Sequence, residues 1–463
     1  MNLLDTITAI STPFGKGGIA VLRISGSDAG EIADKVFCPA SKKKLADIES
    51  GRAVYGQIYS NNNGQKVQID DGIAVFFRAP ASFTGEDTVE ISCHGGVLVT
   101  QRVLEAIMCA GARLALPGEF TKRAFVNGKL SLTEAEALGD LLEAATDEQM
   151  ALARSGMNGK LSTEIGSIYD SICNVLAAIY ARIDYPDEDL ADIGREEMLE
   201  VTRKNLSSLA SLCDTYSTGH AVTEGVSTVI VGRTNAGKST LYNRIVGRDA
   251  AIVTDIAGTT RDVLTEKARL GRVTLRLSDT AGLRESCDVV EQIGIDRAKS
   301  EAEQAELILA VFDGSRAPDG DDVEFVKYLK TLKGTRIAII NKSDLGILSS
   351  VTELAQDFEY VIPFSANSGE GSDLLRETVE RIYIDKDLRV GEDAIISNAR
   401  QNSAATRARQ TLEAAISAIE GELPLEVCCV EVENSLAMLG ELDGRVVSED
   451  IVSRIFANFC VGK

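Results

Sequence analysis

The sequence contains no tryptophan and only two histidines, His94 and His220. This scarcity argues against a zinc site built on histidine and against a Ser-His-Asp catalytic triad. The nine cysteines form no CxxC pair, and the first residues, MNLLDTITAIS, lack the basic and apolar regions of a signal peptide. We therefore expect a cytoplasmic protein with reduced thiols.

The chain also lacks long apolar runs and an excess of basic residues. No stretch approaches the roughly eighteen apolar residues of a membrane-spanning helix, so we expect no membrane anchor. Lysine and arginine number 48 against 70 aspartates and glutamates, and the formal net charge is −22. Because such an acidic chain binds nucleic acid poorly without specificity, contact with RNA is expected to be local or made through a partner. The basic cluster Lys42-Lys43-Lys44 is expected to be a solvated loop.

The residues that are present change in pattern along the chain. Residues 1–125 mix short β-like runs, such as TITAIS, GIAVLRISG, GIAVFFRAP and TVEISC, with glycine turns, which is typical of an α/β or α+β domain. In residues 126–225 apolar residues recur at helical spacing. Thr133, followed three residues later by Glu136, has the spacing of a helix-capping box.

The second half of the chain shows the same order of patterns, with strand-like runs followed by helices. In residues 226–384 the short apolar runs STVIVG, RLSD, LILAVFDG, IAIINKSD and VIPFSAN alternate with helical stretches, which predicts a parallel α/β sheet. Residues 385–463 return to helices. The simplest account is an α/β domain inserted into a discontinuous helical domain, because the ends of a domain often lie close together at its surface.

The run Gly232-Arg-Thr-Asn-Ala-Gly-Lys-Ser239 matches the P-loop pattern GxxxxGK[ST] and lies between a strand-like run and a helical run. Backbone N–H groups of such a loop close around phosphate oxygens. Lys238 is expected to neutralise the β- and γ-phosphates, and Ser239 to bind Mg2+.

Four further elements follow in a fixed order. Gly258-Thr-Thr260 offers Thr260 as a second Mg2+ ligand, and Asp279-Thr-Ala-Gly282 offers a carboxylate for metal-bound water and an N–H for the γ-phosphate. In Asn341-Lys-Ser-Asp344 the last carboxylate can accept both N1–H and N2–H of guanine, which adenine does not offer. Ser365-Ala-Asn367 can donate a backbone N–H to guanine O6. Together with the P-loop, these elements predict a Ras-like G domain that binds GTP.

One position departs from Ras-like enzymes. They carry a glutamine after DxxG that orients the attacking water, whereas this chain has Leu283. Leucine cannot orient water, so help in the transition state must come from an arginine, an acidic residue downstream or a bound cation. Arg284 and Glu291 lie just downstream, and from the residues alone each is also an ordinary solvated charge.

Several stretches outside the G-domain motifs carry a further signal. They include TITAISTPFGKGGIAVLRISG, SFTGEDTVEISCHGG, PGEFTKRAFVNGKLSLTEAEAL, AAIVTDIAGTTRDV and the final FCVGK. With GRTNAGKST, DTAGLRES and NKSD, they make the chain resemble the bacterial tRNA modification GTPase MnmE (TrmE) family over essentially its whole length. Two departures from the family pattern, Thr234 for a proline and Val461 for an isoleucine, remove no functional group.

The resemblance implies a multidomain fold of α/β plus all-α parts. It implies an N-terminal α/β domain over residues 1–125 that binds tetrahydrofolate and dimerises. It also implies a discontinuous helical domain over residues 126–225 and 385–463, which ends in a CxGK motif, with the Ras-like P-loop G domain inserted at 226–384.

The resemblance also addresses the missing glutamine. A K+ ion is implied to bind Asn235, Thr259 and backbone oxygens near Thr254 and Ile256, where it would supply the charge of an arginine finger. Glu291 is implied to orient the attacking water through a second water. The implied catalytic residues are Glu291, Lys238 and Asn235. The residues expected to contact GTP lie in or beside the five motifs and in the loop that precedes Gly258. They are Asn235, Ala236, Gly237, Lys238, Ser239, Thr240, Thr254, Asp255, Ile256, Ala257, Gly258, Thr259, Thr260, Asp279, Thr280, Ala281, Gly282, Asn341, Lys342, Asp344, Ser365, Ala366 and Asn367.

For the folate pocket the resemblance points to Arg23, Glu90, Lys129 and the C-terminal Lys463. A glutamate can pair with the amide and amino edge of a pterin, and basic side chains suit the glutamate carboxylates of folate. From the residues alone, Arg23 and Lys129 would be ordinary surface charges. We expect Lys463 to reach the pocket of a partner in a homodimer.

The function implied by the resemblance is that of a K+-activated GTPase that works with an FAD-containing partner, MnmG (GidA). Together they would install an aminomethyl or carboxymethylaminomethyl group at C5 of the wobble uridine of certain tRNAs. A 5-formyl- or 5,10-methylene-tetrahydrofolate would supply the one-carbon unit, with tRNA bound largely through the partner. The alternatives are a ribosome-assembly or RNA-chaperone GTPase without modification chemistry, and a folate-dependent aminomethyl transferase with an added G domain.

The C-terminal segment FCVGK raises a separate question. A prenylation box needs aliphatic residues after its cysteine, and Gly462 and Lys463 do not fit. Upstream, Val452, Ile455, Phe456 and Phe459 fall on one helical face that is expected to pack inward. Cys460 is therefore expected on a docked helix, as a buried thiol or as a nucleophile.

Overall fold

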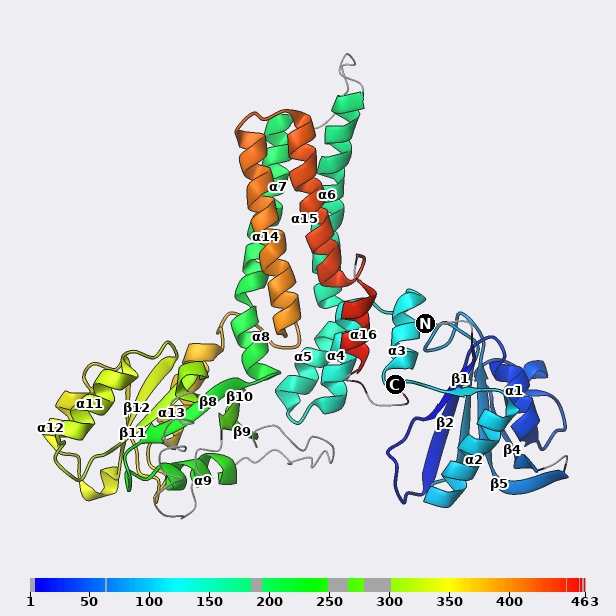
Figure 1. Ribbon diagram of the computed structural model, residues 1–463, viewed down its shortest axis with the longest axis horizontal. Helices are drawn as coiled ribbons and strands as arrows, with labels where there is room; N and C mark the ends of the chain where they lie inside the picture. Colours follow the sequence, from blue (N-terminus) through cyan, green and yellow to red (C-terminus); the bar gives the residue numbers. More distant parts are fainter. Residues whose placement is uncertain are drawn as a thin grey trace. The chain divides into compact units, whose positions relative to one another are not determined.

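The computed structural model describes residues 5–62, 65–184, 194–248, 265–278, 301–446, 448–457, 459 and 462. The chain forms two compact units (Figure 1). Unit 1 comprises Met1–Gly139 with Gly440–Lys463, and unit 2 comprises Asp140–Leu439. The expected combination of α/β and all-α parts is confirmed.

A seven-stranded sheet forms the centre of unit 1, with the strand order β3-β4-β5-β6-β2-β1-β7. Its strands are β1 (Ile7–Ile10), β2 (Ile19–Ser25), β3 (Phe37–Pro39), β4 (Ala53–Asn62), β5 (Gln65–Phe77), β6 (Thr88–His94) and β7 (Arg113–Leu114). Neighbouring strands are antiparallel, except that β1 and β7 are parallel. The helices α1 (Ala29–Val36) and α2 (Val97–Ala110) pack on one face, because alternation turns residues such as Leu22 and Ile91 toward them.

One end of the opposite face is covered by α3 (Glu119–Val126), whose Phe120 packs with Ile7 and Ala9 of β1. The helix α16 (Glu449–Ala457) packs nearby, and Val452 and Phe456 are buried while Ile455 and Phe459 pack against them. The expected inward face of this helix is confirmed.

Gly118 allows α3 and α16 to approach closely. Its φ is +65°, and a Cβ atom there would lie 2.3 Å from the carbonyl oxygen of Phe456. A side chain at this position would therefore meet both backbone strain and a backbone atom.

The capping box expected at Thr133 and Glu136 is wrong. The helix α4 (Leu132–Glu143) begins at Leu132, so Ser131 caps it: Ser131 N donates to Glu134 Oε2 at 2.6 Å and Glu134 N donates to Ser131 Oγ at 3.2 Å. Thr133 already lies inside the helix, and its hydroxyl donates to Asp443 instead.

Unit 2 contains a group of long helices (Figure 1). They are α6 (Lys160–Asp184), α7 (Arg195–Asp214), α14 (Ala399–Glu420) and α15 (Leu425–Asp443), preceded by the shorter α5 (Asp147–Met157). The apolar residues expected at helical spacing in the first of these helices are buried in part: Val175 and Ile179 are fully buried, whereas Tyr180 is 43% exposed. No helix in the described part of the chain is both long and apolar enough to cross a membrane.

The α/β part of unit 2 is a six-stranded sheet with the order β13-β12-β11-β8-β10-β9. Its strands are β8 (Val226–Gly232), β9 (Thr265–Leu270), β10 (Val273–Ser278), β11 (Leu307–Asp313), β12 (Thr335–Asn341) and β13 (Tyr360–Pro363). All neighbours are parallel except β9, which is antiparallel to β10. The five expected apolar runs are strands, whereas β9, a charged edge strand with the sequence TEKARL, was not predicted.

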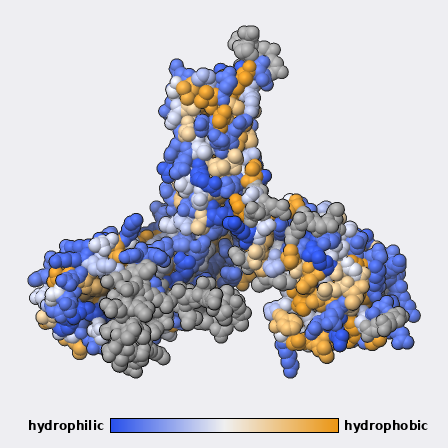
Figure 2. Space-filling model, viewed as in Figure 1, coloured by the Kyte–Doolittle hydropathy of each residue, from blue (hydrophilic) through white to orange (hydrophobic). Residues whose placement is uncertain are grey.

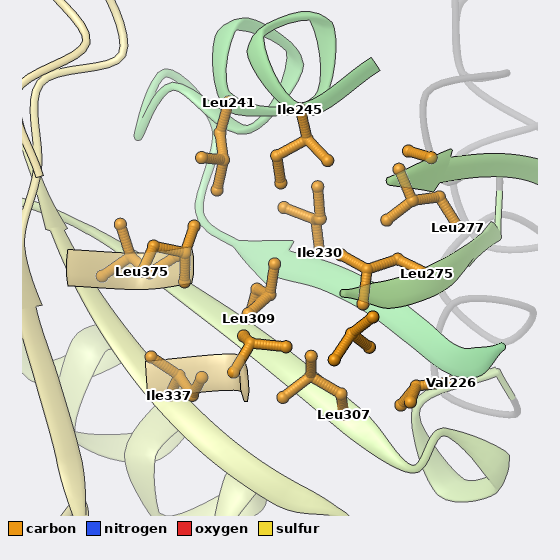
Figure 3. Packing of buried hydrophobic residues seen from close by; sticks show 14 of the residues in the cluster. Val226, Ile230, Leu241, Ile245, Leu275, Leu277, Leu307, Leu309, Ile337 and Leu375 are labelled. Atoms are coloured by element: carbon orange, nitrogen blue, oxygen red, sulfur yellow. The ribbon is translucent and has the colours of Figure 1, made fainter. Parts of the chain in front are cut away.

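Both faces of this sheet are covered, which explains its continuous apolar runs. Figure 3 shows Leu241 and Ile245 of α9 (Lys238–Arg248) over Ile230 of β8, with Leu375 of α13 (Ser372–Tyr383) on the same side. The other face packs against α11 (Gly320–Leu329) and α12 (Ser349–Ala355).

The chain enters and leaves the α/β part beside α8 (Tyr216–Val222). Thr223 Oγ1 donates to the carbonyl oxygen of Ser397 at 2.8 Å, and Asp385 N donates to Thr218 Oγ1 at 2.9 Å. The two crossings are thus hydrogen-bonded neighbours.

Candidate functional site

The P-loop joins the end of β8 to the start of α9. Asn235 and Gly237 both have left-handed backbone, with φ of 65° and 96°. Gly237 cannot carry a side chain, because a Cβ atom would lie 2.0 Å from Asn341 Nδ2. Ser239 and Thr240 are in the first turn of α9, where free N–H groups and the helix dipole favour a phosphate.

Lys238 is held against the same loop. Its Nζ donates to the carbonyl oxygens of Gly232 at 2.8 Å and of Arg233 at 2.9 Å. Burial lowers the pKa of this ammonium, because removal from water disfavours the charged form. An anionic phosphate beside Lys238 would stabilise its charged ammonium. The loop therefore fits a nucleotide phosphate.

Asn341 connects three of the predicted motifs. Its Nδ2 donates to the carbonyl oxygen of Ala236 at 2.8 Å, and its Oδ1 accepts from Ala366 N at 3.0 Å. Asn341 is buried, so both bonds are protected from water. The P-loop, the NKSD motif and the SAN motif therefore meet at the carboxyl ends of β8, β12 and β13, where open α/β sheets bind their ligands.

The remaining described residues of the guanine motifs flank this junction. Lys342 has a left-handed φ of 65°, and its Nζ lies 2.6 Å from Asp313 Oδ2. Asp344 and Asn367 are exposed, whereas Ser365 is buried. An exposed carboxylate beside a loop N–H can face the edge of a guanine.

Sequence reasoning missed two contributors to this site. Asp313 ends β11 directly opposite Asn341 of β12 and holds Lys342; a polar residue closing the run LILAVF was the signal. The P-loop residue Arg233 forms ion pairs with Asp319 and Asp321 at the start of α11, and no motif marked it.

Several predicted residues lie outside the described part of the chain, and their roles stay predictions. They are Thr254, Asp255, Ile256, Ala257, Gly258, Thr259, Thr260, Asp279, Thr280, Ala281, Gly282, Glu291, Cys460 and Lys463.

The structure brings Arg23 and Glu90 together in unit 1. They are direct partners across β2 and β6, and Arg23 Nε and Nη2 donate to Glu90 Oε1 at 2.9 and 2.7 Å. The guanidinium also lies 5.1 Å from the ring centroid of Phe83 and 5.6 Å from that of Phe120. Within the described residues, the buried Nη1 of Arg23 has no hydrogen-bond partner.

Lys129 and the C-terminal segment lie near the same strands. Lys129 is exposed, and its Nζ donates to the carbonyl oxygen of Pro80 at 3.1 Å. Gly462 docks on this chain's own β1: its carbonyl oxygen accepts from Ser11 Oγ at 3.3 Å, and a Cβ atom would lie 2.3 Å from the carbonyl oxygen of Ile10. Lys463, which is expected to reach a partner's pocket, lies outside the described residues, so that expectation stays a prediction.

The matches to known proteins extend over nearly the whole chain. The family profile described as "GTP-binding protein TrmE N-terminus" matches residues 6–129, and that described as "MnmE helical domain" matches residues 132–460. Three relatives carry the name tRNA modification GTPase MnmE. The relative from Streptococcus thermophilus is 40% identical over 99% of this chain and 98% of its own length. Those from Clostridioides difficile and Lactococcus lactis are 37% and 39% identical, over 100% and 99% of this chain and 100% and 98% of their own lengths. The chain therefore belongs to the tRNA modification GTPase MnmE family.

Proposed function

We propose that the protein is a K+-activated GTPase that works with an FAD-containing partner of the MnmG (GidA) type. The pair installs an aminomethyl or carboxymethylaminomethyl group at C5 of the wobble uridine of certain tRNAs, in the cytoplasm. The observation that carries the proposal is the Asn341 bridge between the P-loop and the guanine motifs, on a chain whose full length matches relatives named tRNA modification GTPases.

The residues around the P-loop support GTP hydrolysis. Lys238 holds phosphate oxygens, the N-terminal turn of α9 donates N–H groups, and Asp344 accepts the N1–H and N2–H of guanine. Ser239 and Thr260 would hold Mg2+, and Asn235 with the loop 254–259 would hold K+; these ions would supply fixed positive charge beside the phosphates. Glu291 orients the attacking water in this proposal.

The residues of unit 1 support folate binding. The unpartnered Nη1 of Arg23 can donate to a folate acceptor, and Glu90 can accept from a pterin amino group. Lys129 and Lys463 suit the glutamate carboxylates of a 5-formyl- or 5,10-methylene-tetrahydrofolate. Cys460 is a candidate thiol at the same end of the chain.

A homodimer formed through the first domain is part of the proposal. Phe14, Ile19 and Leu98 are 68%, 69% and 66% exposed. Apolar patches of this kind are also visible on this unit in Figure 2. Such exposure is typical of interaction surfaces. The proposed domain boundaries are 1–125 for the folate domain, 126–225 and 385–463 for the helical domain, and 226–384 for the G domain.

Deletion of the gene followed by mass spectrometry of tRNA tests the proposal. We expect the C5 modification of wobble uridines to be lost and to return when the gene is restored. Unchanged modification, with ribosome subunits accumulating instead, would support the alternative of a ribosome-assembly GTPase.

A further inference from the structure

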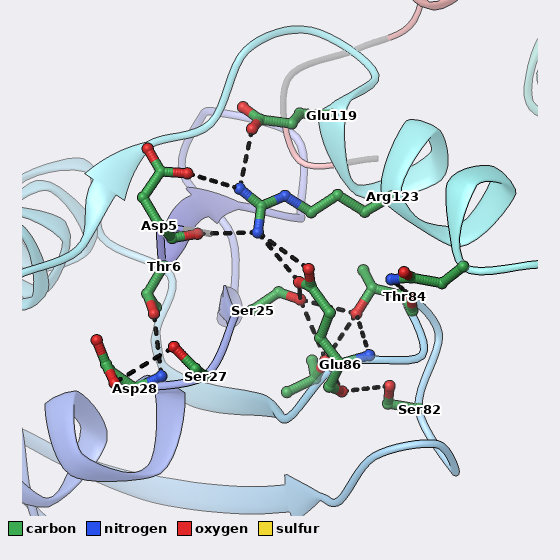
Figure 4. Close-up of polar contacts among 12 residues, drawn as sticks. Asp5, Thr6, Ser25, Ser27, Asp28, Ser82, Thr84, Glu86, Glu119 and Arg123 are labelled. Atoms are coloured by element: carbon green, nitrogen blue, oxygen red, sulfur yellow. Dashed lines mark hydrogen bonds and ion pairs between the residues drawn. The ribbon is translucent and has the colours of Figure 1, made fainter. Parts of the chain in front are cut away.

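A cluster of charges around a buried arginine in unit 1 takes no part in the proposed chemistry (Figure 4). At its centre is Arg123 of α3, whose side chain is 1% exposed. Three carboxylates surround it, from Asp5, Glu86 and Glu119. Arg113 pairs with two of these, Asp5 and Glu119.

The two terminal nitrogens of Arg123 have different partners. Nη2 donates to Asp5 Oδ1 at 3.0 Å and to Glu119 Oε1 at 3.1 Å. Nη1 donates to the two carboxylate oxygens of Glu86 at 3.2 and 3.1 Å and to the carbonyl oxygen of Asp5 at 2.9 Å. One guanidinium thus links α3, the segment before β1 and the loop that carries Glu86.

Burying such a cluster is costly, because each charge loses its hydration. Apolar residues of similar size often stabilise a core as well or better. The cluster is therefore better explained by the geometry it imposes than by stability, and the question becomes which segment it fixes.

Glu86 passes the connection to the loop 80–86. Its Oε2 accepts from Ser25 Oγ at 2.8 Å, and Ser25 Oγ lies 2.7 Å from Thr84 Oγ1. Thr84 Oγ1 also accepts from Glu86 N at 3.2 Å. Ser25 lies two residues after Arg23 in β2, so both side chains are on the same face of the sheet.

The same loop touches two candidate folate-binding residues. Phe83 lies 5.1 Å from the guanidinium of Arg23. The carbonyl oxygen of Pro80 accepts from Lys129 at 3.1 Å, and that of Thr84 accepts from Asn127 Nδ2 at 2.7 Å. A shift of the loop would move the surroundings of both cations.

We propose that Arg123 and Glu86 are positioning residues for the folate site. They fix the loop 80–86, and through Phe83 and Pro80 this loop sets where Arg23 and Lys129 present their donors. The inference rests on the proposed folate binding, and it adds two residues that do not contact the ligand.

The test measures binding of 5-formyltetrahydrofolate to the full-length protein by calorimetry. Glu86→Gln keeps the shape and removes the charge, and we expect the Kd to rise about ten-fold, equivalent to about 1.4 kcal/mol. GTP hydrolysis should be unchanged, because its motifs lie in unit 2. Glu105→Gln is the matched control, because Glu105 is 47% exposed and pairs only with Arg102 of α2 among the ion pairs described. The Kd of this variant for the folate should equal that of the wild type.

A double variant separates positioning from general destabilisation. Because Glu86 acts partly through Phe83, the loss of binding in the combined variant Phe83→Ala and Glu86→Gln should be smaller than the sum of the two single losses. Additive losses would overturn the inference, as would an unchanged Kd for a folded Glu86→Gln. If Glu86→Gln does not fold, Ser25→Ala removes the bonds of the Ser25 hydroxyl to the Glu86 and Thr84 side chains and should give a smaller rise, with an unchanged Kd counting against the inference. A wild-type protein that fails to bind the folate would overturn the proposed function as well.

Discussion

Asn341 shows how one side chain can organise a binding site. Its amide donates to the P-loop through one atom and accepts from the SAN motif through the other. Both partners are backbone groups in a buried setting, where an unpaired polar group costs about 1–3 kcal/mol. The positions of the two loops are therefore coupled through this residue.

Asn341→Ala should raise the Kd for GDP roughly 10- to 100-fold, because the carbonyl of Ala236 and the N–H of Ala366 would both lose a partner. A fluorescent GDP analogue would measure it. Asn205→Ala is the control: Asn205 Nδ2 donates to Ser171 Oγ and to the carbonyl oxygen of Val201, both at 2.8 Å, in the helical part. It should lower the melting temperature without changing the Kd; equal Kd values for both variants would contradict the role of Asn341.

Asp344→Asn tests the specificity for guanine. An asparagine cannot accept both N1–H and N2–H, but its amide can donate to the C2 carbonyl of xanthine. We expect weaker GTP binding, by about 100-fold, and a gain in binding of XTP. If the variant still prefers GTP over XTP, guanine does not bind at Asp344.

Sequence motifs identified most of the described residues near the P-loop, because Gly237, Lys238 and Asn341 follow fixed spacings. The spacings could not reveal what these residues touch. Arg123 is the clearest case: nothing in PGEFTKRAF distinguishes a buried arginine from a surface one, because its burial depends on carboxylates from Asp5 and Glu86, far away in the sequence.

At the scale of elements, α16 depends on a glycine in a different segment. Gly118 has φ of +65° and lies against the backbone of Phe456. The helical face of α16 was predictable from its own sequence, whereas the surface that receives it was not. Likewise, β9 was missed because a strand at the edge of a sheet does not need a continuous apolar run; of its described side chains only that of Ala268 is buried.

Gly118→Ala should destabilise the folded protein by about 2–4 kcal/mol, the sum of backbone strain and overpacking. Hydrogen exchange should show faster opening of α16. Gly128→Ala is the matched control, since Gly128 has φ of +68° and no neighbouring atom within 4 Å of the place that a Cβ atom would take. If the two variants lose equal stability, the contact with Phe456 is unimportant.

His220 at the junction of α8 and β11 predicts a pH dependence. Its Nδ1 lies 3.2 Å from Glu224 and its Nε2 3.1 Å from Glu306. Arg276 lies 3.8 Å from Glu306, and the tilted ring of Tyr216 has its centroid 5.3 Å from that of His220. These carboxylates, Glu224 first, raise the pKa of His220 to about 9 from 6.5. The stabilisation is complete below about pH 6.5 and is lost as the pH rises through about 9.

His220→Gln should therefore lower the free energy of unfolding at pH 7 by about 2 kcal/mol, allowing for the partial exposure of the carboxylates. The difference from the wild type should shrink above pH 9, and denaturant titrations at pH 7 and 10 would measure it. His94→Gln provides the comparison: His94 also pairs with a carboxylate, that of Asp70 at 2.8 Å, but it is exposed, so solvent screens the pair and the loss should be smaller. A deficit that is the same at both pH values would show that His220 acts by packing alone.

At the scale of the whole molecule, the chain has Leu283 at the position where Ras-like enzymes carry the glutamine that orients the attacking water. We therefore expect GTP hydrolysis to depend on another group. We expect GTP turnover to be about ten-fold or more faster in K+ than in Na+, because a fixed cation offsets charge developing on the phosphates. Asn235→Ala should remove this difference without abolishing nucleotide binding. Equal rates in the two salts for the wild type would contradict the cation's role.

The two crossings between helical and α/β parts, joined by the bond from Thr223 to Ser397, also bear on how such a protein can arise. Because the segment entering and the segment leaving are neighbours, a domain between them adds little separation between the helical segments on either side. A complete nucleotide-binding domain can thus be acquired in a single insertion into a loop.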